Sequence, residues 1–411
     1  METQASRVRH VPDFVVAFVV FVVACAVFLP TMTTTGVQAN DTRAAAVAAY
    51  LYVETGSLTF PESWPNDHAY WAVERADGRV SVNRMPGVIL TGVPFYAAAR
   101  LLGVTPRLDA VTHPVFVPYG PAGVAAAVTA ALALAALFRL LTQVVSRRDA
   151  LIATAILGVT TPIWSVAADA LWPHATTALM LALVMNRRVH PLVVGAATAV
   201  LVMTRPHLMI VPVVFGLARR STYVVSLAVG GVAGLLLLIG YSQMLFGTWL
   251  PASGYDTSGF LSRLVTATPY ATAENIGQAW FNVDRGIAIH TPWILLLLPF
   301  VFGVWRDAPA FVKRGFIAGL LYFLLQMRMA RFSGGSGFAQ WRTSLETLLL
   351  WAPLLAITAA TLLRRYRTLL VVFTAAALFA LVMTVRGVAD GGRSDWAEEW
   401  WAEQHTKHAP A

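Results

Sequence analysis

The sequence contains very little cysteine and few charged residues. Its single cysteine, Cys25, excludes a disulfide framework within the chain and a cysteine metal site. Charged residues make up 12% of its 411 residues, whereas soluble domains typically contain about 25%. It also lacks a Walker loop, a dinucleotide-binding fingerprint and a nucleophile elbow, so soluble nucleotide chemistry is not indicated. These absences argue against a soluble globular protein.

Hydrophobic residues make up 57% of the chain and are gathered into long runs such as residues 15–29. Runs of this length are typical of transmembrane helices, and their lack of alternation excludes the strands of a membrane barrel. The formal net charge is +9, but the basic residues occur as short pairs at the ends of the runs. This distribution reflects membrane topology and gives no reason to expect nucleic acid as a partner.

We therefore predict an all-α polytopic membrane protein, with a single transmembrane domain over residues 1–411. The hydrophobic runs predict about eleven transmembrane helices, at residues 13–30, 115–142, 149–167, 172–187, 190–205, 207–218, 222–245, 286–305, 314–330, 345–363 and 367–386. The spans near 190–218 are short, and we expect them to be tilted, kinked at Pro206 or partly re-entrant.

Pairs of basic residues set the predicted orientation, because cytoplasmic loops carry an excess of lysine and arginine. If every predicted span crosses, six basic sites fall on one side: Arg7 and Arg9, Arg147 and Arg148, Arg187 and Arg188, Arg219 and Arg220, Lys313 and Arg314, and Arg364, Arg365 and Arg367. This side is the predicted cytoplasmic face, so the N-terminus is inside and the C-terminus outside. The predicted location is the plasma (inner) membrane.

The segment Pro86–Gly103 is long enough to cross, but counting it would reverse every later loop. We interpret it as a juxtamembrane helix at the outer interface, with Arg100 at the lipid headgroups. Most of the polar sequence then lies outside, in loops 31–114, 246–285 and 331–344 and in a tail, 387–411, whose tryptophans suggest an interfacial anchor. A cleavable signal peptide ending near Ala39 is a weaker alternative, because that position lies far from the apolar stretch.

Asp41 is the first candidate for chemistry. Residues 42–53 are predicted to form a helix that ends near Gly56. Asn40 or Asp41 could be the N-cap of that helix, or Asp41 could be a general base that accepts a proton from a hydroxyl. The two roles are compatible, and the residues alone leave both open.

Several arginines are predicted on the outer face, where the topology rule disfavours them. They are Arg205, which precedes Pro206, Arg285 at the start of a span, and Arg328, Arg331 and Arg342 around the loop FSGGSGF. Each alone could anchor to headgroups or join an ion pair. If they converge on one cavity, a phosphate-bearing ligand explains them better, because guanidinium matches phosphate geometry.

Asp169 and His174 flank the predicted outer turn between the third and fourth spans. They either form a satisfied turn, with Asp169 capping the next helix, or form a second polar cluster that faces the same cavity as Asp41. The acidic residues and His174 show no metal-ligand spacing, so we expect no metal and no other cofactor.

The order of the outer-face motifs resembles the polytopic glycosyltransferases of the GT-C class, which use lipid-phosphate sugars. The class includes protein O-mannosyltransferases, aminoarabinose transferases and arabinofuranosyltransferases. The resemblance covers most of the chain and rests on QANDTRAAAVAAYLYVETGSLTF, NRMPGVILTGVPFYAAARLLG, TTPIWSVAADALWPHATTALML, TRPHL, LFGTWLPASGY, FNVDRGIAIHTPWILLLLP and FSGGSGFAQWR.

The resemblance implies a catalytic base at Asp41 and a second acidic residue at Asp169. Many members carry a paired Asp-Glu at the first position, whereas this chain has Asn40-Asp41-Thr42. The resemblance also implies a set of residues that bind the donor phosphate: Arg205, Arg285, Arg331, Arg342 and His174.

The predicted activity is transfer of a sugar from a polyprenyl-phosphate donor to an extracytoplasmic acceptor hydroxyl, with inversion. The acceptor would be a glycan, a lipid or a protein, and membrane lipids are the other expected partners. A transporter or flippase of a lipid-linked or anionic solute is the alternative, and a non-catalytic membrane scaffold is a third interpretation. Short cytoplasmic loops and a one-sided polar face favour the enzyme over the transporter.

Overall fold

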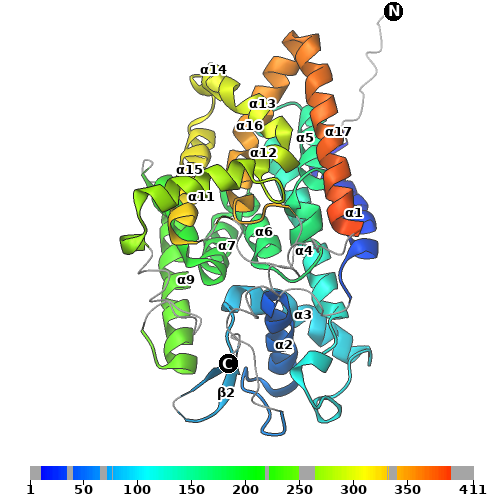
Figure 1. The fold of residues 1–411 in the computed structure, drawn as a ribbon, viewed down its shortest axis with the longest axis vertical. Helices are drawn as coiled ribbons and strands as arrows, with labels where there is room; N and C mark the ends of the chain where they lie inside the picture. The colour runs from blue at the N-terminus through cyan, green and yellow to red at the C-terminus, as the bar shows by residue number, and fades with distance from the viewer. Residues whose placement is uncertain are drawn as a thin grey trace, which may run out of the picture.

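The computed structural model describes residues 11–34, 40–64, 72–75, 77–217, 222–249, 264–330, 332 and 340–389. These residues form a helical bundle with a smaller unit at one end, built from α2, α3 and a short hairpin (Figure 1). The prediction of an all-α membrane protein agrees with this architecture.

The first half of the chain contains most of the elements around the site. They are α1 (Asp13–Phe28), α2 (Asn40–Thr55), the antiparallel strands β1 (Ala72–Glu74) and β2 (Val80–Val82), α3 (Pro86–Leu101), α4 (Gly120–Leu141), α5 (Arg147–Val159), α6 (Pro173–Met185), α7 (Pro191–Thr204) and α8 (Ile210–Gly216). Short 3₁₀ turns occur at Leu29–Thr31, Leu108–Ala110, Pro114–Phe116 and Pro206–Met209, and a π-helical turn at Ile163–Ala167.

The second half of the chain contains the remaining helices. It contains α9 (Thr222–Phe246), α11 (Pro269–Phe281), α12 (Ile287–His290), α13 (Pro292–Leu297), a 3₁₀ turn at Leu298–Phe300, α14 (Val301–Trp305), α15 (Ala310–Met329), α16 (Leu345–Arg365) and α17 (Arg367–Ala389).

Within the described residues, six helical segments are long and apolar enough to cross a membrane: Asp13–Thr31, Gly120–Leu141, Thr222–Phe246, Ala310–Met329, Leu345–Arg365 and Arg367–Ala389. The other five predicted spans correspond to short or broken helices. Prolines account for two of the breaks: the chain is extended at Arg205 before Pro206, and Pro292 begins a new helix within the predicted span 286–305. Eleven crossings and their orientation stay predictions.

Helix α2 confirms the helix predicted over residues 42–53 and its end near Gly56, which has a left-handed φ of +70°. Its residues Ala44–Leu51 are buried, and it packs mainly against α3. The small side chains permit this close packing: a Cβ on Gly92 of α3 would lie 2.9 Å from the Cβ of Ala49. Helix α2 is thereby held closely against α3.

The segment Pro86–Gly103 is helical, as predicted, and also contacts α4, α6 and α7. Arg100, predicted at the headgroups, pairs with Glu54 at 3.5 Å and donates to the carbonyl of Val53. The position of α3 relative to lipid stays a prediction.

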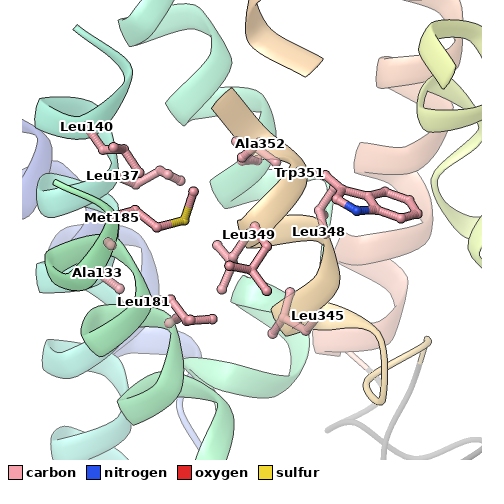
Figure 2. Packing of buried hydrophobic residues seen from close by; sticks show 14 of the residues in the cluster. Ala133, Leu137, Leu140, Leu181, Met185, Leu345, Leu348, Leu349, Trp351 and Ala352 are labelled. Atoms are coloured by element: carbon pink, nitrogen blue, oxygen red, sulfur yellow. The ribbon is translucent and has the colours of Figure 1, made fainter. Parts of the chain in front are cut away.

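The larger hydrophobic core lies between α4, α6 and α16. Figure 2 shows their side chains projecting toward one another, among them Leu137, Leu140, Leu181, Met185, Leu345 and Leu349. Elsewhere, α7 and α9 approach each other through glycines, since a Cβ on Gly230 would lie 2.1 Å from the carbonyl oxygen of Gly195. Close approach through small residues is a common way for helices to associate within membranes.

Candidate active site

Asp41 lies in the first turn of α2, where a carboxylate is stabilised by the N-terminal end of the helix dipole. The helix begins at Asn40, so Asp41 is inside the helix rather than at the preceding cap position. Its side chain remains 34% exposed, although most of the surrounding helix is buried. An ionised group that keeps this much open surface can still meet a ligand.

Arg84 holds Asp41 from the loop between β2 and α3. Its Nη2 lies 2.6 Å from Oδ1 of Asp41, its Nε donates to the Asp41 carbonyl at 2.9 Å, and its Nη1 donates to the Asn83 carbonyl at 2.8 Å. The Tyr241 hydroxyl of α9 donates to the Arg84 carbonyl at 2.7 Å. Arg84 is buried, so it fixes both the backbone and the carboxylate of Asp41.

Arg342 approaches Asp41 from the segment before α16, with Nη2 at 3.9 Å from Oδ2. Its guanidinium also lies over the ring of Trp172, 4.2 Å from the ring centroid. A cation placed over an indole face is attracted to it and held in orientation. The structure thus brings Arg342 to Asp41, as the phosphate-site prediction requires.

Gln340 shapes the backbone that presents Arg342. It has a left-handed φ of +64°, which is uncommon for a residue with a side chain. Its buried amide accepts a hydrogen bond from Ser165 at 2.8 Å and donates one to Thr384 at 2.9 Å. These contacts, from the π-helical turn Ile163–Ala167 and from α17, hold a conformation that would otherwise be unfavourable.

A second group of polar residues is buried around Glu346. Glu346, in the first turn of α16, is 0% exposed and lies 2.9 Å from His174, 2.8 Å from Thr177 and 3.6 Å from Arg205. Arg205 donates to Tyr322 at 3.0 Å and lies 3.2 Å from Nε2 of His174. His174 and Arg205, both predicted site residues, therefore lie together around Glu346.

Asp169 occupies a different position from the predicted helix cap. Helix α6 begins after Trp172, while the buried Asp169 carboxylate accepts a hydrogen bond from the Thr33 hydroxyl at 3.0 Å. Its carbonyl accepts from the Thr33 backbone at 2.9 Å. The capping interpretation was wrong: Asp169 ties the segment after α1 to the turn before α6. Its catalytic role stays a prediction.

Arg285 lies in the turn between α11 and α12, whose neighbours are α13, α15 and α17 rather than α2. It is buried, and burial lowers its pKa while the adjacent Asp284 carboxylate opposes that shift. Its part in the phosphate site stays a prediction. Arg331 lies outside the described residues.

Sequence reasoning missed several residues of this cluster, above all Arg84, Trp172, Tyr322, His207 and Glu346. The ring of His207 stacks on Tyr322, with centroids 5.4 Å apart. Glu346 carried a usable signal, because an ionisable residue at the start of an apolar span is a functional candidate. Arg84 stands in the recognised juxtamembrane motif, but nothing in the sequence indicates that it reaches back to Asp41.

The charges of the described site residues favour the binding of an anion. Arg84, Arg205 and Arg342 face the carboxylates of Asp41 and Glu346, which leaves one positive charge in excess when the histidines are neutral. Among the described residues, no three His, Cys, Asp or Glu side chains are grouped to hold a metal ion. The arrangement can bind a phosphate beside a partly exposed carboxylate.

A scan against protein-family models and a search of curated proteins find no match to the chain. Solved structures do match. A crystal structure of the Archaeoglobus fulgidus oligosaccharyltransferase in complex with Zn and sulfate aligns with a TM-score of 0.52 and 12% identity, covering 91% of this chain and 53% of that one. The apo form of the same enzyme aligns with a TM-score of 0.51 and 12% identity, covering 92% of this chain and 56% of that one.

The chain thus spans about half the length of the oligosaccharyltransferase that it matches. At this identity the likeness concerns the arrangement of helices. The resemblance inferred from the sequence motifs and the independent likeness between the folds agree with each other. The chain has a GT-C-like fold.

Proposed function

We propose that the chain is a membrane glycosyltransferase that transfers a sugar from a polyprenyl-phosphate donor to an extracytoplasmic acceptor hydroxyl. The GT-C-like fold supports the class of enzyme. The observation that carries the proposal is Asp41, a partly exposed carboxylate held between the buried guanidiniums of Arg84 and Arg342. A base and a phosphate-binding group are thus adjacent.

In the proposed reaction, a carboxylate oxygen of Asp41 accepts the proton of the acceptor hydroxyl. The hydroxyl oxygen forms a bond to the anomeric carbon as the bond from that carbon to the phosphate oxygen breaks. Polyprenyl phosphate departs with the bonding electron pair, and attack on the face opposite to it inverts the configuration. Arg205 and Arg342 stabilise the charge that develops on the phosphate.

The donor also needs a place for its apolar chain. A pocket lined mainly by aromatic and aliphatic side chains adjoins the start of α16: Trp280, Ile287, Ile294, Phe323, Trp341, Ser344, Thr347, Leu348 and Trp351. Ser344, Thr347 and Leu348 share one face of the helix, and Glu346 lies on another. We propose that these side chains form an apolar contact surface for the lipid chain beside the segment that carries Arg342. Arg285 and Arg331 are further proposed contacts for the donor, and Asp169 is proposed as the second acidic residue.

Transfer assays with purified protein and a panel of polyprenyl-phosphate sugars test the proposal. Asp41→Asn should lower transfer by about 10²–10⁴-fold, the usual contribution of a general base. Asp109→Asn is the matched control, because Asp109 is exposed on the same predicted outer loop. Normal transfer by Asp41→Asn would remove Asp41 as the base. Movement of intact donor across vesicles without transfer to any acceptor would favour the transporter instead.

A further inference from the structure

Glu346 is the most deeply buried charged group near the site. Its carboxylate contacts residues from three other parts of the chain: His174 and Thr177 of α6, Arg205 after α7, and Tyr322 of α15, at 3.4 Å. We call these five residues the Glu346 cluster. It joins α6, α15 and α16 to the break between α7 and α8.

The contacts determine how His174 is protonated. A guanidinium can only donate hydrogen bonds, so Nε2 of His174, 3.2 Å from Arg205, must accept. The proton of a neutral His174 is then on Nδ1, where it is donated to Oε1 of Glu346 at 2.9 Å. His174 is thus a neutral link between the carboxylate and the guanidinium. Within the cluster, Arg205 alone balances the charge of Glu346.

Stability does not explain such a pair. The cost of removing two charges from water often exceeds their attraction, so a buried ion pair is weak evidence of a stabilising role. Arg205 also keeps 15% of its side-chain surface exposed, so a ligand can reach it while Glu346 holds it.

We propose that Glu346 is a positioning residue that keeps Arg205 beside His174. Held in this way, Arg205 remains available to the donor phosphate. This inference rests on the proposed function for its kinetic consequence. Its structural part, that Glu346 and not Asp41 holds Arg205, can be tested without any substrate.

Labelling of Arg205 with phenylglyoxal, quantified by mass spectrometry, tests the structural part. Glu346→Gln keeps the side-chain shape and removes the charge, so Arg205 should be labelled about tenfold faster than in the wild type, as expected for loss of one charge-assisted contact. Asp41→Asn should leave the labelling rate unchanged. The matched control is Glu54→Gln, which removes the carboxylate paired with Arg100 and should also leave Arg205 unchanged.

Wild-type labelling in Glu346→Gln would overturn the proposal, and so would an equal increase in Asp41→Asn. Glu346→Asp covers the case in which the Gln variant does not fold. It retains the charge one methylene farther from Arg205, so labelling between the wild type and full release is expected. Labelling of the Asp variant at the wild-type rate would likewise contradict the proposal.

Kinetics test the functional part. Glu346→Gln should raise the donor KM by about 10- to 100-fold with a smaller loss in kcat, because it misplaces a phosphate-binding group. Glu346→Asp should recover part of that loss, whereas a purely structural role would not separate KM from kcat. An unchanged donor KM in Glu346→Gln would refute positioning. If the wild type transfers no sugar at all, the proposed function fails, while the labelling result still decides the role of Glu346.

Discussion

Replacing Arg84 with lysine tests whether the orientation of Asp41, and not only its charge, matters. Arg84 makes two contacts to Asp41, one to its carbonyl at 2.9 Å and one to its carboxylate at 2.6 Å, and a third to Asn83 at 2.8 Å. Lysine carries the same charge at a single point and cannot reproduce this fork. It would keep about one of the two contacts to Asp41.

A hydrogen bond to a charged group contributes about 1.5–3 kcal/mol. Because Asp41 is partly exposed, water replaces part of the lost contact, and we expect a loss of about 1–2 kcal/mol in transition-state stabilisation. That corresponds to a decrease in kcat/KM of roughly 5- to 30-fold. The measurement is initial-rate transfer with the donor identified in the panel assay.

The exposed Arg79, directly before β2, provides the control, since Arg79→Lys should stay within twofold of the wild type, or about 0.4 kcal/mol. The account of Asp41 would be refuted if Arg84→Lys also stayed within about twofold of the wild type while Asp41→Asn lost activity. Such a result would mean that the contacts from Arg84 do not set the geometry of the base.

Two further predictions concern packing and topology. Gly230→Ala places a Cβ against the Gly195 carbonyl and should destabilise the α7–α9 pair by about 1–3 kcal/mol, measured as a lower melting temperature in detergent. Gly240→Ala is the control, because nothing lies within 4 Å of its added Cβ. Equal melting temperatures for the two variants would contradict the close approach of α7 and α9. In a Cys25→Ser background, Asp109→Cys should react with an impermeant maleimide added outside intact cells. Arg188→Cys should react only after the cells are permeabilised. The reverse pattern would overturn the predicted orientation of the chain in the membrane.

Features governed by local sequence could be predicted. Helix α2 and its end at Gly56 follow from hydrophobic pattern and the conformational freedom of glycine. The break at Arg205-Pro206 follows from the missing amide hydrogen of proline and its steric effect on the preceding residue. The fold class also followed, because the lipid environment leaves few alternatives.

The site was predicted in part, since composition and topology placed Asp41, Arg205 and Arg342 on one face. The partners that hold them were missed because they come from distant parts of the chain. His174 meets Glu346 across 172 positions, and Arg84 meets Asp41 across 43. Such pairings depend on how the helices pack, which a single sequence does not specify. The motif also places Arg285 with the phosphate-binding group, and this placement stays a prediction.

The most direct test of the central claim separates donor binding from transfer in Asp41→Asn. Binding of the active polyprenyl-phosphate sugar and a single turnover with saturating acceptor would be measured in the same preparation. Because Arg84, Arg205 and Arg342 remain, the variant should bind donor within a few-fold of the wild type, less than about 1 kcal/mol. Its single-turnover rate should fall by about 10²–10⁴-fold. A wild-type turnover rate, or a loss explained entirely by weaker donor binding, would contradict Asp41 as the base.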